Sequence, residues 1–422
     1  MLSGLRPRQR RLAIACLIYV ATTCVYFAFA DAAVIHEHTP WNHFALLADA
    51  WKKGRLDLGG PPPSYTGNND FSRFAGKWFV VFPPFPALLL LPAVALAQSP
   101  EQVHDGQFFL WLAGLAPACL FLALDKLARF GRSQVSELGN VGLSLSFAFG
   151  SVYFFSAEQG TVWYAAHVVG AALAALYLLF ALEAERPWLA GVALGLGFAT
   201  RTPLLFAAQL FVLEAWRTSR PRFLRSLLAF ATPVALVVGL TLLHNQLRFG
   251  DPFEVGYRYL GIAWQHRIEK WGLFGYHYLA KNLGVVLTSL PFWTPTGPAP
   301  FQINAHGLAL WLTTPAYLWL LRAKRRAVPE RALWLTVALV ALPTLFYQNT
   351  GWVQFGYRFS NDYAIFLWAL LAVTATRFSP WFRAAVVAAV LINAFGAWTF
   401  GRARYAAFYF QDNTQRIVYQ PD

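Results

Sequence analysis

Long apolar runs alternate with short polar segments along the whole chain. A helix needs about 20 predominantly apolar residues to cross the hydrocarbon core of a bilayer, and eleven runs reach or approach that length. The predicted spans are residues 12–30, 107–124, 139–156, 162–182, 188–200, 203–216, 226–247, 306–321, 332–348, 361–376 and 382–400. The pattern therefore predicts an all-α polytopic membrane protein, with residues 1–422 forming a single integral membrane domain.

Two further segments are apolar but rich in proline. Residues 78–98 and residues 281–300 each contain four prolines, which remove backbone donors and break helices. If residues 78–98 do not cross, the short inner loops carry 19 Lys and Arg residues. A crossing would place every later basic loop outside, against the positive-inside rule. We therefore predict interfacial or re-entrant elements on the outer side for both segments.

These assignments define two large outer regions. The first periplasmic loop covers residues 31–106 and includes interfacial and re-entrant helices, and the second large periplasmic segment covers residues 248–305. Irregular backbone at membrane depth must be covered by protein or line a water-filled cavity. A cavity at the outer face is therefore expected.

The first outer loop also contains a helical pattern. Apolar residues recur there at spacings of three and four, typical of one stripe of a helix: Trp41, Phe44, Ala48 and Trp51. Gly54 is expected to end this helix. The helix is predicted to lie in the interface plane with its Trp rings at headgroup level, either as a simple anchor for the loop or as part of a site.

The composition supports a membrane protein, since 57% of the residues are hydrophobic and 13% are charged. The net charge of +14 is interpreted as Lys and Arg in cytoplasmic loops, because no basic stretch has the aromatic interleaving of a nucleic-acid site. The three cysteines lie inside apolar runs and are interpreted as small core residues. No Walker motif or Gly-x-Ser-x-Gly elbow occurs, which argues against an ATP-driven pump and a serine hydrolase.

Acidic side chains on the outer side are the candidates for a general base. A general base must lie within hydrogen-bond reach of the proton that it removes. Glu37 follows the first span, Asp70 precedes a Gly-Lys-Trp-Phe turn, and Glu158 lies in the second outer turn. Each could instead be a solvated loop acid. The small number of other outer acids favours a functional role for Glu37 and Asp70.

Four basic residues on the same side fit an anion pocket: Lys77, Arg201, Arg258 and Arg358. Ionisable groups at membrane depth are costly and mark functional sites, and Arg presents a bidentate fork to phosphate. Arg258 and Arg358 each follow Gly-Tyr in a short repeated pattern. The alternative for each is an ion pair with a loop carboxylate or a contact with lipid headgroups.

Three further polar residues are candidates for substrate binding. His43 and Asp49 lie off the apolar stripe of the interfacial helix, and His167 lies inside a predicted span. The alternative role for His167 is a structural hydrogen bond to a neighbouring helix.

A metal site has little support in the sequence. His36 and His38 could form part of one with Glu37 or His43. However, no HExxH spacing and no cysteine ligand accompanies them, and adjacent loop histidines are more often surface groups. No cofactor is predicted, and a role for a divalent cation stays open.

Motifs along most of the chain resemble those of a known family. They are the triplet Asn42-His43-Phe44, the turn Gly76-Lys77-Trp78-Phe79, and residues 47–50, 54–58, 80–88, 160–163, 199–203, 247–252 and 354–358. The chain resembles bacterial integral-membrane glycosyltransferases of the C-type superfamily. The similarity is to the branch of the protein mannosyltransferases that use dolichyl-phosphate mannose and of the aminoarabinose transferases.

The resemblance implies an enzyme that takes a sugar from a polyprenyl-phosphate carrier on the periplasmic side. It also implies a base in the first outer loop, a supporting acid in the second outer loop, matched by Glu158, and a proline-rich element that covers the cavity. The sequence departs from the family between Thr39 and Asn42, where an acid is usual and none is present. Glu37 and Asp49 are the nearest acids.

The predicted function is that of a hexosyl- or pentosyltransferase in a bacterial inner membrane, with its site facing the periplasm. Its partners would be a polyprenyl-phosphate sugar donor, a lipid or cell-envelope glycan acceptor and membrane lipids, but not nucleic acid. A transporter or flippase for a lipid-linked glycan is the alternative, although it would need charges along a path through several spans. A non-catalytic protein on the same scaffold would explain the missing acid.

Overall fold

The computed structural model describes residues 6–68, 70–218, 220–262, 264–322, 328–374 and 378–410. Most of these residues are helical. The α-helices are α1 Pro7–Phe29, α2 Ala32–His36, α3 His43–Lys52, α4 Phe85–Leu96, α5 Asp105–Ala113, α6 Leu115–Arg129, α7 Glu137–Phe149, α8 Tyr153–Ala157, α9 Val162–Ala181, α10 Pro187–Phe198, α11 Ala208–Thr218, α12 Phe223–Phe249, α13 Gln265–Trp271, α14 Leu279–Thr288, α15 Leu310–Thr313, α16 Val328–Leu345, α17 Asn361–Thr374 and α18 Pro380–Thr399.

Two small sheets accompany the helices. β1 (Phe71–Phe74) and β2 (Lys77–Val80) form an antiparallel hairpin in which Phe71 lies opposite Val80. In the second sheet, β4 (Phe301–Asn304) lies between β3 (Phe292–Trp293), which is antiparallel to it, and β5 (Tyr409–Phe410), which is parallel to it. The short 3-10 helices include η5 Thr202–Ala207, η9 Pro315–Arg322 and η10 Arg358–Ser360.

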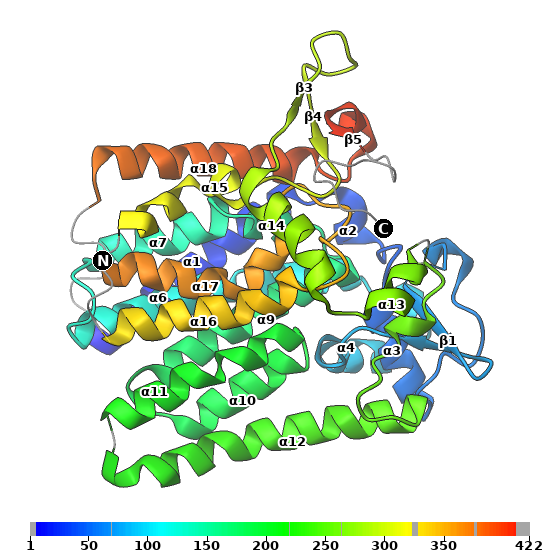
Figure 1. Cartoon of the computed structure of the whole chain (residues 1–422), viewed down its shortest axis with the longest axis horizontal. Helices are drawn as coiled ribbons and strands as arrows, with labels where there is room; N and C mark the ends of the chain where they lie inside the picture. The colour runs from blue at the N-terminus through cyan, green and yellow to red at the C-terminus, as the bar shows by residue number, and fades with distance from the viewer. Residues whose placement is uncertain are drawn as a thin grey trace.

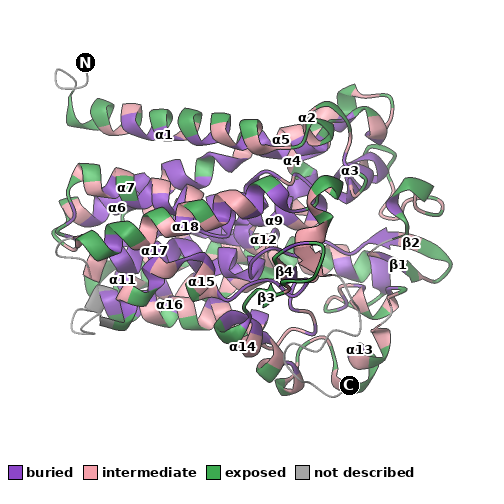
Figure 2. Ribbon diagram, turned by 90° about the horizontal axis from the view of Figure 1, so that it is seen from above, coloured by how far each residue is buried: buried purple, intermediate pink, exposed green. Residues whose placement is uncertain are grey.

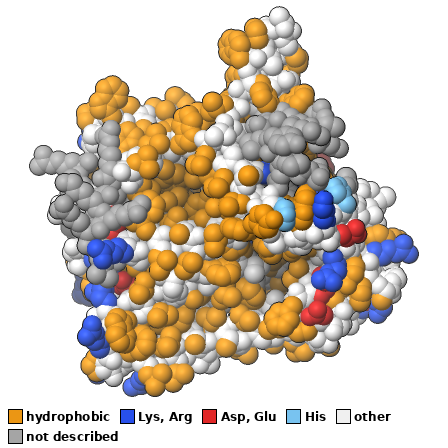
Figure 3. Space-filling view, viewed as in Figure 1, with side chains coloured by type: hydrophobic (Ala, Val, Ile, Leu, Met, Phe, Trp, Pro, Cys, Tyr) orange, Lys and Arg blue, Asp and Glu red, His pale blue; other side chains and the backbone are white. Residues whose placement is uncertain are grey.

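The long helices run side by side through the molecule (Figure 1). Five helical stretches of the described chain are long and apolar enough to cross a membrane. They are α1 (Pro7–Phe29), α5 together with α6 (Asp105–Arg129), α9 with the 3-10 turn after it (Val162–Ala184), α12 with the 3-10 turn before it (Arg220–Phe249) and α18 (Pro380–Thr399). The chain is therefore a multi-pass membrane protein. Apolar side chains cover the middle of one face, whereas Lys and Arg gather towards its two ends (Figure 3).

The predicted count of eleven spans is not confirmed. The predicted span 203–216 is the 3-10 helix η5 followed by α11, and the span 306–321 is the four-residue α15 followed by η9. Pro203 and Pro315 lie at the starts of the 3-10 segments, and proline cannot donate the backbone hydrogen bond that would continue a regular helix.

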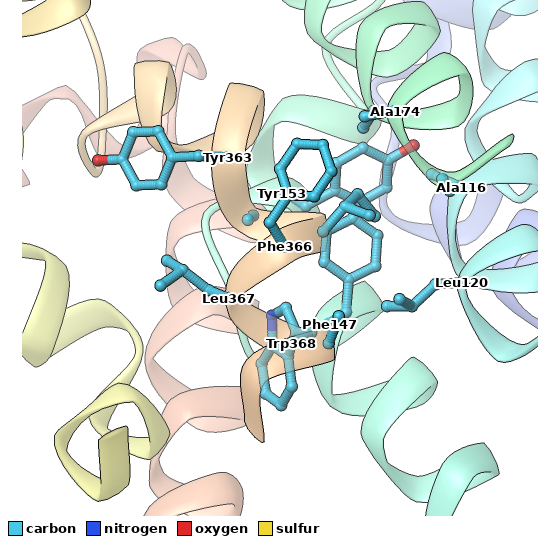
Figure 4. Packing of buried hydrophobic residues seen from close by; sticks show 14 of the residues in the cluster. Ala116, Leu120, Phe147, Tyr153, Ala174, Tyr363, Phe366, Leu367 and Trp368 are labelled. Carbon is cyan, nitrogen blue, oxygen red and sulfur yellow. The ribbon is translucent and has the colours of Figure 1, made fainter. Parts of the chain in front are cut away.

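Helix α9 forms the centre of the bundle and is buried along most of its length. Its alanines and glycine let α6, α10 and α17 approach closely. Aromatic side chains of α7, α8 and α17 fill the space beside it, and the rings of Phe147 and Tyr153 stack at 4.7 Å (Figure 4). The outer faces of α1 are exposed (Figure 2), as expected for a surface that meets lipid.

The two ends of the bundle differ. The start of α1 and the α6–α7 connection lie at one end, the predicted inner side (Figure 1). Helices α2, α3 and α4 and the β1–β2 hairpin lie at the other end, the predicted outer side (Figure 1). The proline-rich residues 78–98 contribute part of β2 and the 12-residue helix α4 there.

Helix α3 is buried more completely than its single apolar stripe indicates. The helix ends before Gly54 as predicted, and Gly54 has φ of +68°. However, α3 is buried nearly all round, including Asn42, His43 and Asp49. Helix α4 and strand β2 pack against it. The apolar stripe described only one of its buried faces, because partners distant in sequence cover the others.

Candidate functional site

A cavity of about 830 Å³ lies at the end of the bundle where the loops gather. Its wall comes from the residues on either side of the β1–β2 hairpin, Trp41, the start of α9, the α10–η5 turn, the end of α12, residues 252–274, residues 343–359 and residues 400–401. The volume is within the range of roughly 300–1,000 Å³ typical of small-molecule sites. Among the described residues, its charged wall residues are Asp70, Arg201, Arg248 and Arg358.

Asp70 supplies the carboxylate of this wall. It precedes β1 with φ of +60°, a left-handed conformation that Asp adopts more readily than most residues. Its Oδ2 accepts a hydrogen bond of 2.7 Å from the indole N–H of Trp163. Burial raises the pKa of this carboxyl, while the hydrogen bond from Trp163 and the charges of His43 and Arg358 act in the opposite direction. Asp70 is therefore held at the cavity wall with a carboxyl pKa above its usual value.

Arg358 supplies a cation without a carboxylate partner. Its side chain reaches the cavity from η10, and only 6% of the residue is exposed. The guanidinium donates to the carbonyl oxygens of Gly351 and Val353, the latter at 3.1 Å, and its Nε has no partner among the described residues. No carboxylate in the described part of the chain lies within the 4.0 Å of an ion pair with it. Its charge is therefore available to an anion in the cavity.

Arg201 lies nearby but is held by an ion pair. Its Nε and Nη2 donate to the two carboxylate oxygens of Asp362 at 2.9 and 2.7 Å, and the Nδ1 of His167 lies 3.3 Å from the same carboxylate. The phenyl ring of Phe359 lies 5.3 Å from the Arg201 guanidinium and 5.5 Å from that of Arg358. The Phe359 ring therefore makes cation–π contacts with the guanidinium groups of both Arg201 and Arg358 beside the cavity.

The Arg201–Asp362 pair yields a stability prediction. Replacing Asp362 with asparagine would leave a largely buried guanidinium without its counter-charge, which typically costs about 3–5 kcal/mol of folding free energy. We expect a clear loss of thermal stability for D362N, measured by intrinsic fluorescence in nanodiscs. The matched control is D57N, which breaks the exposed Lys77–Asp57 pair and should cost less than about 1 kcal/mol. Equal stability of D362N and wild type would contradict this role.

Three predicted site residues line the cavity: Asp70, Arg201 and Arg358. Three others lie directly behind it. His43 is buried and stacks on Phe71 at 4.2 Å, His167 contacts Asp362, and Glu158 is buried and accepts a hydrogen bond of 2.6 Å from the wall residue Gln159. Burial raises the pKa of the Glu158 carboxyl well above its usual range. These side chains support the wall rather than face the cavity.

The remaining four predicted residues lie outside the cavity. Glu37 is exposed at the end of α2, and Asp49 pairs with Lys53 at 2.6 Å. Lys77 is 63% exposed beside Asp57, and Arg258 is 65% exposed and pairs with Glu254 at 2.6 Å. None of the four predicted residues contributes to the wall. The interpretation of Lys77 and Arg258 as partners of loop carboxylates is the one that the structure supports.

Several wall residues were not predicted from the sequence. Arg248 lies at the end of α12, where its Nη1 donates to the Val80 carbonyl at 2.7 Å and its Nη2 to Asn245 at 2.8 Å. Tyr257 lines the cavity although its neighbour in the Gly-Tyr-Arg pattern, Arg258, does not. A basic residue that ends a long apolar helix was the available signal for Arg248. No sequence signal distinguished the tyrosine from the arginine.

The wall does not fit a divalent cation. Asp70 is its only carboxylate among the described residues, and no group of three His, Cys, Asp or Glu side chains in that part of the chain could hold a metal ion. Magnesium and calcium prefer several oxygen ligands, usually carboxylates.

No family model and no curated protein matches the chain. Two solved structures are similar to it. The apo oligosaccharyltransferase of Archaeoglobus fulgidus matches over 92% of this chain with 15% identity and a TM-score of 0.50. The oligosaccharyltransferase AglB of the same organism, in complex with an inhibitory peptide and a dolichol-phosphate, matches over 94% with 12% identity and a TM-score of 0.46. The chain covers 55% and 56% of these proteins. The first likeness shows a similar membrane fold.

Proposed function

We propose that the chain is a membrane glycosyltransferase that moves a sugar from a polyprenyl-phosphate donor to a hydroxyl of a lipid or cell-envelope glycan. One observation carries this proposal: a carboxylate, Asp70, and two guanidinium groups, Arg201 and Arg358, share the wall of one cavity. The likeness of the fold to an oligosaccharyltransferase supports the class of reaction. The outer-face orientation rests on the predicted sidedness of the basic loops.

The arginines would bind the phosphate of the donor. Arg358 has no carboxylate partner among the described residues, so an incoming phosphate would not have to displace one. Arg201 adds a second positive charge, held in place by Asp362. Guanidinium groups form short, charge-assisted hydrogen bonds with phosphate. Negative charge grows on the phosphate as the sugar leaves, so these preorganised cations would stabilise the transition state more than the ground state.

Asp70 would act as the general base. The acceptor oxygen forms a bond with the anomeric carbon of the sugar, and the bond from that carbon to the phosphate oxygen breaks. The electron pair of the broken bond stays on the phosphate, and the hydroxyl proton passes to the Asp70 carboxylate. The raised pKa of Asp70 suits this task, because a more basic carboxylate accepts a proton more readily.

A transfer assay tests the proposal. Membranes containing the protein would be incubated with radiolabelled polyprenyl-phosphate sugars and cell-envelope lipids, and labelled products would be separated by chromatography. We expect label to leave the polyprenyl carrier with wild-type protein. Movement of the intact labelled donor across liposomes, without chemical change, would instead favour a flippase.

The pH profile tests the environment of Asp70. The base must be ionised, so activity should fall as the pH drops through the raised pKa of this carboxyl. In W163F the lost indole N–H no longer stabilises the carboxylate, and the acid limb of kcat/KM should move to higher pH by about one unit. The matched control is W41F, because Trp41 also lines the cavity and packs 5.1 Å from Trp163. Equal profiles for the two variants would contradict the role of the hydrogen bond.

A further inference from the structure

The chain between α13 and α16 contains a long stretch without charged residues. From residue 282 to residue 321 the chain carries no Asp, Glu, Lys or Arg. This stretch contains the hairpin of β3 and β4, whose tip is Thr-Pro-Thr-Gly-Pro-Ala-Pro at residues 294–300. The first outer loop, by contrast, carries five acidic residues between Asp31 and Asp70. The hairpin is therefore uncharged, unlike the first outer loop at the same end of the molecule.

The hairpin also exposes large apolar side chains. Trp293 is 74% exposed, and Phe292, Leu290 and Leu287 are exposed beside it. None of these residues lines the cavity. Clustered exposed apolar residues mark an interaction surface rather than ordinary solvent-facing chain.

The direction of the hairpin identifies its partner. It projects sideways from the bundle, across the direction of the long helices, near one end of α18 (Figure 1), and forms an apolar knob on the surface (Figure 3). At its base, Phe301 packs against Phe395 at 5.7 Å, one turn before α18 ends at Thr399. Because α18 is one of the candidate spans, the hairpin lies at the depth where the bilayer surface is expected.

We propose that the β3–β4 hairpin inserts its apolar side chains into the lipid headgroup layer at this end of the bundle. Trp side chains prefer that layer, where an apolar ring meets a wet surface. Trp311 and Trp398 are also partly exposed near this level and would extend the same aromatic belt. The partner is thus the bilayer surface itself. This location is independent of the proposed sugar transfer.

The hairpin is linked to the loop that carries Arg358. Beyond β4, the carbonyl of Ala305 accepts a hydrogen bond of 3.2 Å from the backbone N–H of Gln354. The Gln354 amide donates to the His306 carbonyl at 2.7 Å and accepts from the backbone N–H of Arg358 at 3.0 Å. An anchored hairpin would therefore fix the depth of Arg358 relative to the phosphate layer of the membrane.

Depth-dependent fluorescence quenching tests the location. With Cys16, Cys24 and Cys119 replaced by alanine, W293C would be labelled with an environment-sensitive fluorophore and reconstituted in phosphatidylcholine nanodiscs. We expect a nitroxide on the lipid headgroup to quench this label at least twofold more than a nitroxide deep in the acyl chain. A label in K77C, on the exposed β1–β2 hairpin, should be quenched little by either. T296C at the tip provides a second reporter if W293C alters folding.

Three results would overturn the proposal. Quenching at residue 293 no greater than at residue 77 would place the hairpin in water. Stronger quenching from the deep acyl position would make it a re-entrant element instead. Disulfide-linked dimers of unlabelled W293C, together with no lipid quenching, would assign the surface to a second copy of the chain. Each result is obtained without measuring sugar transfer.

Discussion

Replacing Asp70 with asparagine is expected to lower kcat for sugar transfer by about 10²- to 10⁴-fold, the usual contribution of a general base. Asparagine keeps the shape of the side chain, and its amide oxygen can still accept the hydrogen bond of the Trp163 indole. It cannot take the proton of an acceptor hydroxyl. Binding of the donor should change little, so KM should stay near its wild-type value. Initial rates with labelled donor would measure both constants.

The control for this variant is E37Q. Glu37 is an acid of the same outer loop, but it is exposed and lies outside the cavity. E37Q should therefore retain wild-type activity. Full activity of D70N, or a comparable loss in E37Q, would remove Asp70 from the role of base.

Replacing Arg358 with alanine is expected to lower kcat/KM by about 10²- to 10³-fold, as for the loss of a preorganised group that stabilises developing charge. R358K keeps the charge but loses the planar fork, so its activity should fall between those of R358A and the wild type. Binding of polyprenyl phosphate without a sugar should weaken in the same order. Steady-state kinetics and lipid binding by native mass spectrometry would measure the two effects.

The chain offers a matched control for this arginine. Arg258 occupies the same place in the other Gly-Tyr-Arg pattern, but its side chain is 65% exposed and pairs with Glu254. R258A should therefore leave kcat/KM almost unchanged. Similar losses in R258A and R358A would show that general surface charge, rather than a phosphate site, explains the effect.

Much of the fold follows from the sequence because apolar runs must become helices in a membrane. The predicted positions of α1, α9, α12 and α18 match the structure closely. Interruptions within spans were harder to predict, as the broken segment around Pro315 shows. The burial of α3 also escaped prediction, because one stripe of apolar residues does not reveal which helices and strands cover the other faces.

The candidate site was predicted only in part. The predicted sidedness of the loops placed Asp70, Arg201 and Arg358 on one side of the membrane, and in the structure the three residues line one cavity. Sidedness does not specify whether a loop residue points inward, so Glu37 and Lys77 were included although both are exposed. The direction of a loop side chain depends on long-range contacts, such as the bond from Trp163 that fixes Asp70.

The most direct test of the central claim is a cryo-electron microscopy structure of D70N in nanodiscs with a bound polyprenyl-phosphate sugar. The account predicts that the phosphate lies within hydrogen-bond distance of the Arg358 guanidinium, with the anomeric carbon facing residue 70 inside the cavity. A phosphate bound away from both Arg201 and Arg358, or a sugar directed away from residue 70, would contradict it.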